Sequence, residues 1–219
     1  NGEARARYVT SNAGERAKIR RTVEDGLQQG GIGIGLLLDY ISEAVDEDEV
    51  RAIFELASQY QTPVFVHIRR GAAGDPTGLD EVLTLAKATG AKVHICHLSH
   101  SAMKNVALFL EKIREARTSG VDVTTEVLPY NAGSTSIGAA VFGRDWQEIF
   151  GIGPEDVQLA STGEFFTQES FDQTRKESPN SAIMHHYLKE EWTRLLVAAP
   201  DVILSSDGLP VISLKEKAP

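Results

Sequence analysis

Three residues whose side chains can bind a metal ion or move a proton stand at the ends of apolar segments. His67 ends the segment VFVH, His97 ends VHICH, and Asp207 follows ILSS. Neutral imidazole nitrogens bind zinc at about 2.0 to 2.1 Å, and bound zinc lowers the pKa of water from about 15.7 to about 7. A carboxylate at the same place can then accept the proton of that water. These residue types therefore predict a metal-dependent hydrolytic site.

Apolar, β-branched segments carry these residues, and segments of helical period separate them. Such alternation is typical of β/α units around a parallel sheet, where polar residues at the C-terminal ends of the strands meet at one rim. The strands are apolar nearly throughout, which predicts a sheet covered on both faces. A (β/α)8 barrel and a doubly wound sheet both satisfy the pattern. The expected strands lie within 32–38, 63–68, 92–97, 121–128 and 202–206.

Apolar residues at helical spacing predict the helices. Ile19, Val23 and Leu27 form the first stripe, and Asn12 with Glu15 resembles a capping box at its start. Further stripes are expected in 46–60, 79–86, 106–113 and 188–195. The pattern weakens over 143–180, where we expect a long loop excursion between two late strands.

Composition narrows the classes of partner. The chain has 219 residues with 42% hydrophobic and 24% charged residues, enough for one sizeable core, and its net charge of -9 disfavours nucleic acid and membrane surfaces. No apolar run approaches the roughly 20 residues that span a bilayer. The single cysteine, Cys96, cannot form an internal disulfide. We expect a cytoplasmic protein, although the start at Asn1 suggests a truncation that leaves room for a removed leader.

Other candidate residues have simpler explanations. Strand alternation predicts that His94 and Cys96 face away from the side of His97, with His94 packed structurally against the helices and Cys96 acting as a small buried hydrophobe. His100 lies in the following loop, where either a substrate contact or a structural hydrogen bond would suit it.

These motifs resemble the D-aminoacylase group of the amidohydrolase superfamily, also called N-acyl-D-amino-acid deacylases. The resemblance covers most of the chain and includes GIGIGL before Tyr40, HIR at 67–69, HLSH at 97–100 and SSDG at 205–208. Its most specific part is EVLPYNAGST at 126–135, which looks like the group's PYxAGST loop.

The resemblance implies a role for each of these residues. His67 and His97 would bind one or two divalent ions, expected to be zinc, at the ends of strands five and six. Asp207 on strand eight would accept a proton from the water nucleophile and return it to the departing amine. Tyr130 would stabilise the oxyanion. The substrate contacts would be Arg69, Tyr40, Ser134 and His100.

The implied fold is a partial (β/α)8 barrel of the TIM type. The chain would supply about strands four to eight, as the C-terminal part of a metal-dependent amidohydrolase barrel over 1–219, with the early strands and a small β domain missing. The group's first-strand His-x-His pair and early cysteine ligand are absent. Ser99 stands where many relatives have a lysine, which weakens the expected carboxylate-binding pattern.

The implied activity is hydrolysis of the amide bond of a small N-acyl amino acid, expected to be of D configuration. A cyclic amidohydrolase resembling hydantoinase or dihydroorotase is the rival enzyme, but the segment 32–38 has no lysine that could bridge two metals. An inactive barrel that binds or scaffolds is the alternative from another class. The acyl group, the side chain of the substrate and the oligomeric state do not follow from the sequence.

Overall fold

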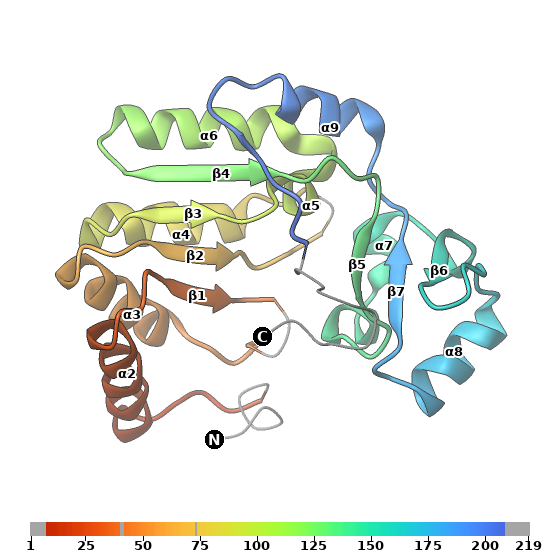
Figure 1. Cartoon of the computed structure of the whole chain (residues 1–219), viewed down its shortest axis with the longest axis horizontal. Coiled ribbons are helices and arrows are strands. Elements are labelled where there is room, and N and C mark those ends of the chain that lie inside the picture. The colour runs from red at the N-terminus through yellow and green to blue at the C-terminus, as the bar shows by residue number, and fades with distance from the viewer. Residues whose placement is uncertain (1–7, 40–41, 73, 209–219) are drawn as a thin grey trace.

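Parallel strands form the main sheet of the computed structural model, which describes residues 8–39, 42–72 and 74–208 (Figure 1). The strand order is β1-β2-β3-β4-β8, and every neighbouring pair is parallel. The parallel sheet expected from the apolar segments is therefore confirmed. The strands are β1 Ile34–Leu37, β2 Val64–His67, β3 Val93–Ile95, β4 Val123–Val127 and β8 Ile203–Leu204.

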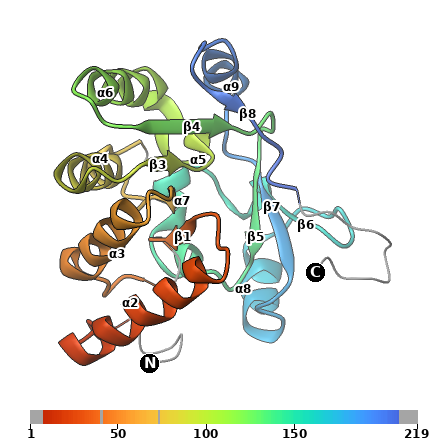
Figure 2. The same cartoon turned by 60° about the vertical axis from the view of Figure 1, so that its left-hand side comes forward.

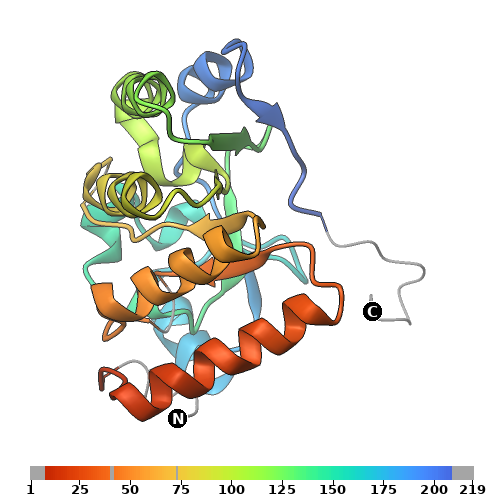
Figure 3. The same ribbon diagram turned by 90° about the vertical axis from the view of Figure 1, so that its left-hand side faces the viewer.

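Helices cover one face of this sheet (Figure 2). Their apolar stripes and the inward residues of the strands share one hydrophobic core, which includes Phe54, Val66, Ile95 and Phe109. In Figure 3 the yellow α4 and the green α6 are seen end-on beside each other on that face. The helices are α2 Ala13–Gln28, α3 Glu47–Gln59, α4 Thr77–Thr89, α5 Leu98–Ala102, α6 Val106–Thr118 and α9 Glu190–Val197, with a 3-10 turn η1 Met103–Asn105 before α6.

The opposite face of the sheet is open in the described part of the chain. Leu37 is 60% exposed, Phe65 40% and Ile203 52%. The prediction that both faces are covered is wrong for these residues, because no described element packs on this side. Strands with apolar residues on both faces are nevertheless typical of sheets in which other elements cover both faces.

The segment between β4 and β8 builds a second unit beside the sheet, seen at the right of Figure 1. Its antiparallel strands have the order β5-β7-β6, and its core is rich in aromatic rings, with Trp146 stacked on Phe171 at 5.0 Å. Residues 143–180, expected to form a loop excursion, thus contain helices and a strand. The elements of this insertion are β5 Gly133–Ser136, η2 Ala140–Gly143, α7 Trp146–Phe150, η3 Pro154–Asp156, β6 Val157–Leu159, α8 Gln168–Glu177 and β7 Ala182–His185.

No helix among the described residues combines the length and the apolar character needed to cross a membrane.

The capping box expected at the start of α2 is confirmed. The Asn12 side chain accepts a hydrogen bond from the Glu15 backbone at 3.0 Å, and the Glu15 carboxylate accepts one from the Asn12 backbone at 2.9 Å. We expect Asn12→Ala to lower the free energy of unfolding by about 1 kcal/mol, because the helix loses this cap. Urea denaturation measures the change. Lys18→Ala, an exposed change within α2, is the control and should shift the midpoint little.

Candidate metal centre and substrate pocket

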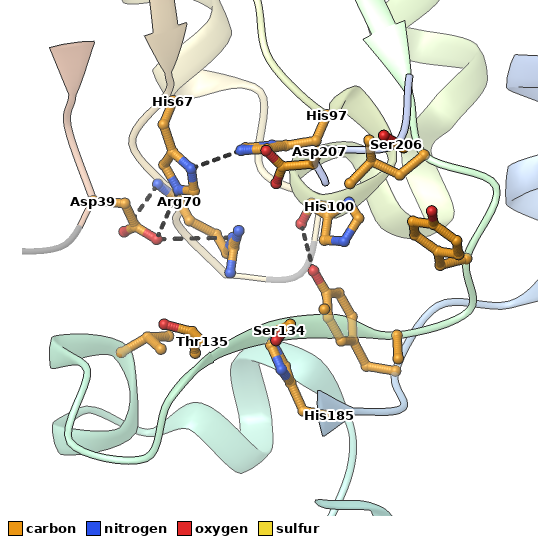
Figure 4. A pocket seen from close by; sticks show the side chains of 16 residues that line it. Asp39, His67, Arg70, His97, His100, Ser134, Thr135, His185, Ser206 and Asp207 are labelled. Carbon is orange, nitrogen blue, oxygen red and sulfur yellow. Dashed lines mark hydrogen bonds and ion pairs between the residues drawn. The ribbon is translucent and has the colours of Figure 1, made fainter. Parts of the chain in front are cut away.

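A cavity opens at the C-terminal ends of the parallel strands, where the sheet faces the insertion (Figure 4). Most of the residues implicated by the sequence meet here. Tyr40 lies outside the described residues, so its predicted substrate contact stays a prediction. The lining residues are Asp39, His67, Arg70, His97, His100, Leu128, Tyr130, Ala132, Gly133, Ser134, Thr135, Val141, His185, Tyr187, Ser206 and Asp207.

The two histidines predicted to bind metal face each other in this cavity. His67 Nδ1 and His97 Nε2 lie 2.9 Å apart, and the two ring centroids are separated by 4.6 Å. Burial is the largest influence on both residues and lowers the pKa of His67 and, more strongly, that of His97. Both rings are therefore held in the neutral form, which is the form of imidazole that binds a metal ion.

The local backbone explains how His97 reaches the cavity. His97 follows β3 in a left-handed conformation with φ of 35°, which breaks the alternation of side chains after Ile95. His94 pairs in register with Phe65 and Thr124, so it lies on the open face of the sheet. The prediction that His94 packs against the helices is wrong, because the alternation rule was applied through a residue that is not extended.

Asp39, just beyond β1, contacts the His67 ring at Nε2, the nitrogen that does not face His97. Its carboxylate lies 3.7 Å from His67 Nε2 and accepts a hydrogen bond from Arg144 at 2.9 Å, while Arg70 Nε is 3.8 Å away. Burial raises the pKa of Asp39, but the neighbouring His67 ring and the charges of both arginines outweigh it and leave the pKa lowered. A carboxylate behind a histidine fixes the orientation of the ring for metal binding.

Sequence reasoning missed Asp39, although it follows an apolar segment just as His67 and Asp207 do. Applying the strand-end rule to the segment 32–38 would have found it. Arg144 carries no comparable signal, because it lies 105 residues away in the insertion.

Asp207 and Tyr130 complete the predicted catalytic set at the rim. Both line the cavity, with Tyr130 47% exposed, and Figure 4 shows Asp207 among the lining side chains. Burial raises the pKa of Asp207, the negative charge of Glu126 adds to this, and His67 opposes it. A carboxyl group with a raised pKa is suited to accept and return a proton. Ser134, predicted to contact substrate, also lines the cavity.

His100 lines the cavity as well, but it is strongly held by protein groups. Its Nδ1 lies 3.1 Å from the Ser99 hydroxyl, and its backbone carbonyl accepts a hydrogen bond from Tyr187 at 3.2 Å. Burial, assisted by the charge of Arg70, lowers the pKa of His100 to about 3. The predicted contact of His100 with substrate stays a prediction.

Arg69 points away from the cavity. Its Nε donates to the Glu81 carboxylate at 2.9 Å, and its two terminal nitrogens donate to the carbonyls of Ser42 at 3.2 Å and Val45 at 2.6 Å. Its guanidinium group therefore joins the loop after β1 to α4. The adjacent Arg70 lines the cavity instead.

A second group of metal-binding residue types lies on the open face of the sheet. One ligand atom each from His94, Cys96 and Glu126 lies within 4.8 Å of the others. Both nitrogens of His94 already have partners, Thr124 Oγ1 at 2.8 Å and Glu126 at 3.5 Å. Burial, followed by the charges of Glu126 and Asp207, raises the pKa of Cys96 to about 12. Because both His94 nitrogens already have protein partners, the pair His67 and His97 is the better candidate for a metal ion.

Comparison with known proteins gives partial matches, and no protein-family model matches the chain. N-acyl-D-glutamate deacylase of Alcaligenes xylosoxydans xylosoxydans is 30% identical over 129 residues, which is 57% of this chain and 26% of the relative. Dihydroorotase of Caldanaerobacter subterraneus subsp. tengcongensis is 41% identical over 66 residues, 28% of this chain and 14% of the relative.

A solved structure shares the fold over almost the whole chain. It is N-acyl-D-glutamate deacylase from Bordetella bronchiseptica, in complex with zinc and a phosphonate inhibitor that mimics the tetrahedral intermediate. The TM-score is 0.72 at 16% identity, covering 91% of this chain and 44% of the other. The resemblance to the D-aminoacylase group is confirmed. The chain spans less than half of the length of the relatives it matches.

Proposed function

We propose that the protein hydrolyses the amide bond of a small N-acyl amino acid of D configuration in a metal-dependent reaction. The observation that carries this proposal is the placement of His67 Nδ1 and His97 Nε2, 2.9 Å apart, in the cavity that Asp207 also lines. Two imidazoles and a carboxylate in one cavity are the residue types that metal-assisted hydrolysis requires.

Zinc is the proposed ion, bound by His67 and His97. A buried ring nitrogen, His97 Nδ1, has no hydrogen-bond partner among the described residues, and Nε2 of the same ring faces His67. Two imidazoles supply half of a four-coordinate zinc shell. When bound, the ion would lower the pKa of a water molecule and polarise the substrate carbonyl.

The residues of the chain would do the remaining work. Asp207 would accept the proton of the attacking water and return it to the nitrogen of the departing amine, and this return makes the amine a better leaving group. The Tyr130 hydroxyl would donate a hydrogen bond to the carbonyl oxygen as negative charge develops there. Asp39 would hold the His67 ring in place.

The parallel strands would belong to a (β/α)8 barrel. In such a barrel the side chains of one sheet face fill the interior, which would account for the open face that carries Leu37, Phe65 and Ile203. Active sites of these barrels lie at the C-terminal ends of the strands, where this cavity is found. We propose a small-molecule substrate and a cytoplasmic location.

A cyclic amidohydrolase remains the second candidate, because a dihydroorotase matches 66 residues. The deacylase match extends over 129 residues, which supports the linear amide. An inactive scaffold is the third alternative.

Assay of the full-length protein separates these functions. With zinc present, we expect release of the free amino acid from N-acetyl-D-glutamate or another N-acetyl-D-amino acid, and loss of this activity with a chelator that is reversed by added zinc. Ring opening of hydantoin or dihydroorotate, without hydrolysis of linear N-acyl amino acids, would favour the cyclic amidohydrolase. Zinc binding without hydrolysis of any of these compounds would favour the scaffold.

A further inference from the structure

Two adjacent arginines leave β2 in different directions. Each of the three guanidinium nitrogens of Arg69 donates a hydrogen bond, to Glu81 or to a backbone carbonyl. The guanidinium group of Arg70 points into the space between Asp39 and His100 (Figure 4). The Arg70 side chain is only 7% exposed, and its Cζ lies 5.3 Å from the centre of the Phe150 ring. The protein therefore holds this guanidinium group in a defined place inside the cavity.

The hydrogen-bonding capacity of Arg70 is not used up by the protein. Its Nε is buried and has no hydrogen-bond partner among the described residues. Asp39 is the nearest carboxylate, but its short contact is with Arg144 at 2.9 Å, whereas Arg70 Nε is 3.8 Å away. Asp39 thus shares one negative charge between two guanidinium groups and forms no short hydrogen bond with the Arg70 side chain.

No other lysine or arginine is found among the described residues that line the cavity. Arginine stays charged at every physiological pH, and its planar fork of N–H donors matches the two oxygens of a carboxylate. A buried, incompletely paired guanidinium group is costly unless an anion completes its hydrogen bonds. The group that would complete them is an anion small enough to enter the cavity.

We propose that Arg70 binds a carboxylate of the substrate and makes the enzyme selective for N-acyl amino acids with a free carboxylate over their uncharged amides. This inference rests on the proposed function, since it identifies a group of the substrate of that reaction. It assigns to Arg70 the part that the sequence suggested for Arg69.

Steady-state kinetics of Arg70→Gln in the zinc-loaded full-length protein tests the assignment. For N-acetyl-D-glutamate we expect KM to rise about 10- to 100-fold, the effect of losing a hydrogen-bonded charge, with kcat within a few-fold of the parent. The fully amidated form of the same compound, which has no carboxylate, should show no such change. Arg70→Lys keeps the charge without the fork and should recover part of the affinity.

N-acetyl-D-alanine distinguishes the two carboxylates. A loss of affinity for both N-acetyl-D-glutamate and N-acetyl-D-alanine would place the α-carboxylate at Arg70, and a loss for the glutamate compound alone would place its side-chain carboxylate there. Either outcome supports the proposal. Arg194→Gln, a change in an exposed arginine paired with Glu190 on α9, is the matched control and should leave KM unchanged.

Other outcomes would overturn the assignment. An unchanged KM for both acids, or an equal rise for acid and amide, would show that Arg70 does not recognise a carboxylate. Calorimetric titration with N-acetyl-D-glutamate separates this failure from failure of the proposed function. If the parent binds the compound without hydrolysing it, and Arg70→Gln weakens that binding, the reaction is wrong but the carboxylate site stands. If neither protein binds it, the site is overturned.

Discussion

Replacing Asp207 with asparagine is expected to lower kcat for amide hydrolysis about 10³-fold while leaving the zinc content per chain unchanged. Asparagine has nearly the same shape as aspartate, but its amide cannot accept a proton from water or return one to the amine. General acid–base catalysis typically contributes 10² to 10⁴ in rate, which sets the expected size of the loss. Turnover of N-acetyl-D-amino acids and metal analysis of the same preparation measure the two quantities.

The pH profile gives an independent readout. Because the Asp207 carboxylate must be unprotonated to accept the proton of water, the profile of kcat/KM should show an acid limb on which activity falls. This limb should be absent from the residual activity of Asp207→Asn. Asp201→Asn is the control, since Asp201 is an exposed residue of the same segment that pairs with Arg117. Turnover by Asp207→Asn at the rate of the parent would remove Asp207 from the mechanism.

Strand-end residues were the part of the site that could be predicted from the sequence. The segments that end at His67 and His97 were recognised from their apolar, β-branched character, and parallel pairing brings their ends to one rim. The same rule covers Asp207, because β8 pairs with β4. The positions of these side chains follow from parallel strands ending at one rim. The apolar segments that form those strands are visible in the sequence.

The choice between neighbouring residues could not be predicted in the same way. Arg69 and Arg70 have the same chemistry, and only the path of the loop after β2 decides which one enters the cavity. His94 was placed on the wrong face because the left-handed backbone at His97 interrupts the alternation. The direction of each of these side chains is set by a few backbone dihedral angles. The periodic pattern of apolar residues does not predict those angles.

The insertion was missed for a different reason. The strand β5 has the sequence GSTS, with little apolar character, and it is extended because it pairs with β7 some fifty residues later. The aromatic residues of its core, such as Phe142, Trp146 and Phe171, come from separate short elements. Long-range pairing of short elements leaves no local periodicity for sequence analysis to detect.

Asp39, Arg70 and Arg144 form a buried charge cluster. Among the residues of the cavity, we expect Asp39 to make the largest single contribution to stability. We expect Asp39→Ala to lower the free energy of unfolding by about 3 kcal/mol. Removing one partner of a buried ion pair typically costs 3 to 5 kcal/mol, and the lower value applies because Arg144 is 34% exposed and can be partly hydrated. Urea denaturation at neutral pH measures the loss, and the exposed change Asp172→Ala on α8 is the control.

The effect should depend on pH in one direction. The folded-state pKa of Asp39 lies below its unfolded value of about 3.8, so its contribution is present above that value and is lost as the pH falls through the folded pKa. The difference between parent and Asp39→Ala should therefore be full at pH 7 and shrink in acid. A difference that grew in acid would contradict this assignment of the charges.

Arg144 connects this cluster to the insertion, so a double-mutant cycle tests whether the cluster couples the two units. Once Arg144→Met has removed one of the cations, Asp39→Ala should cost less than it does in the parent, by roughly 1 to 2 kcal/mol. Equal costs in both backgrounds would mean that Arg144 and Asp39 act independently. A positive coupling would show that the insertion helps to hold the carboxylate that orients His67, so that folding of the insertion and geometry of the proposed metal centre depend on each other.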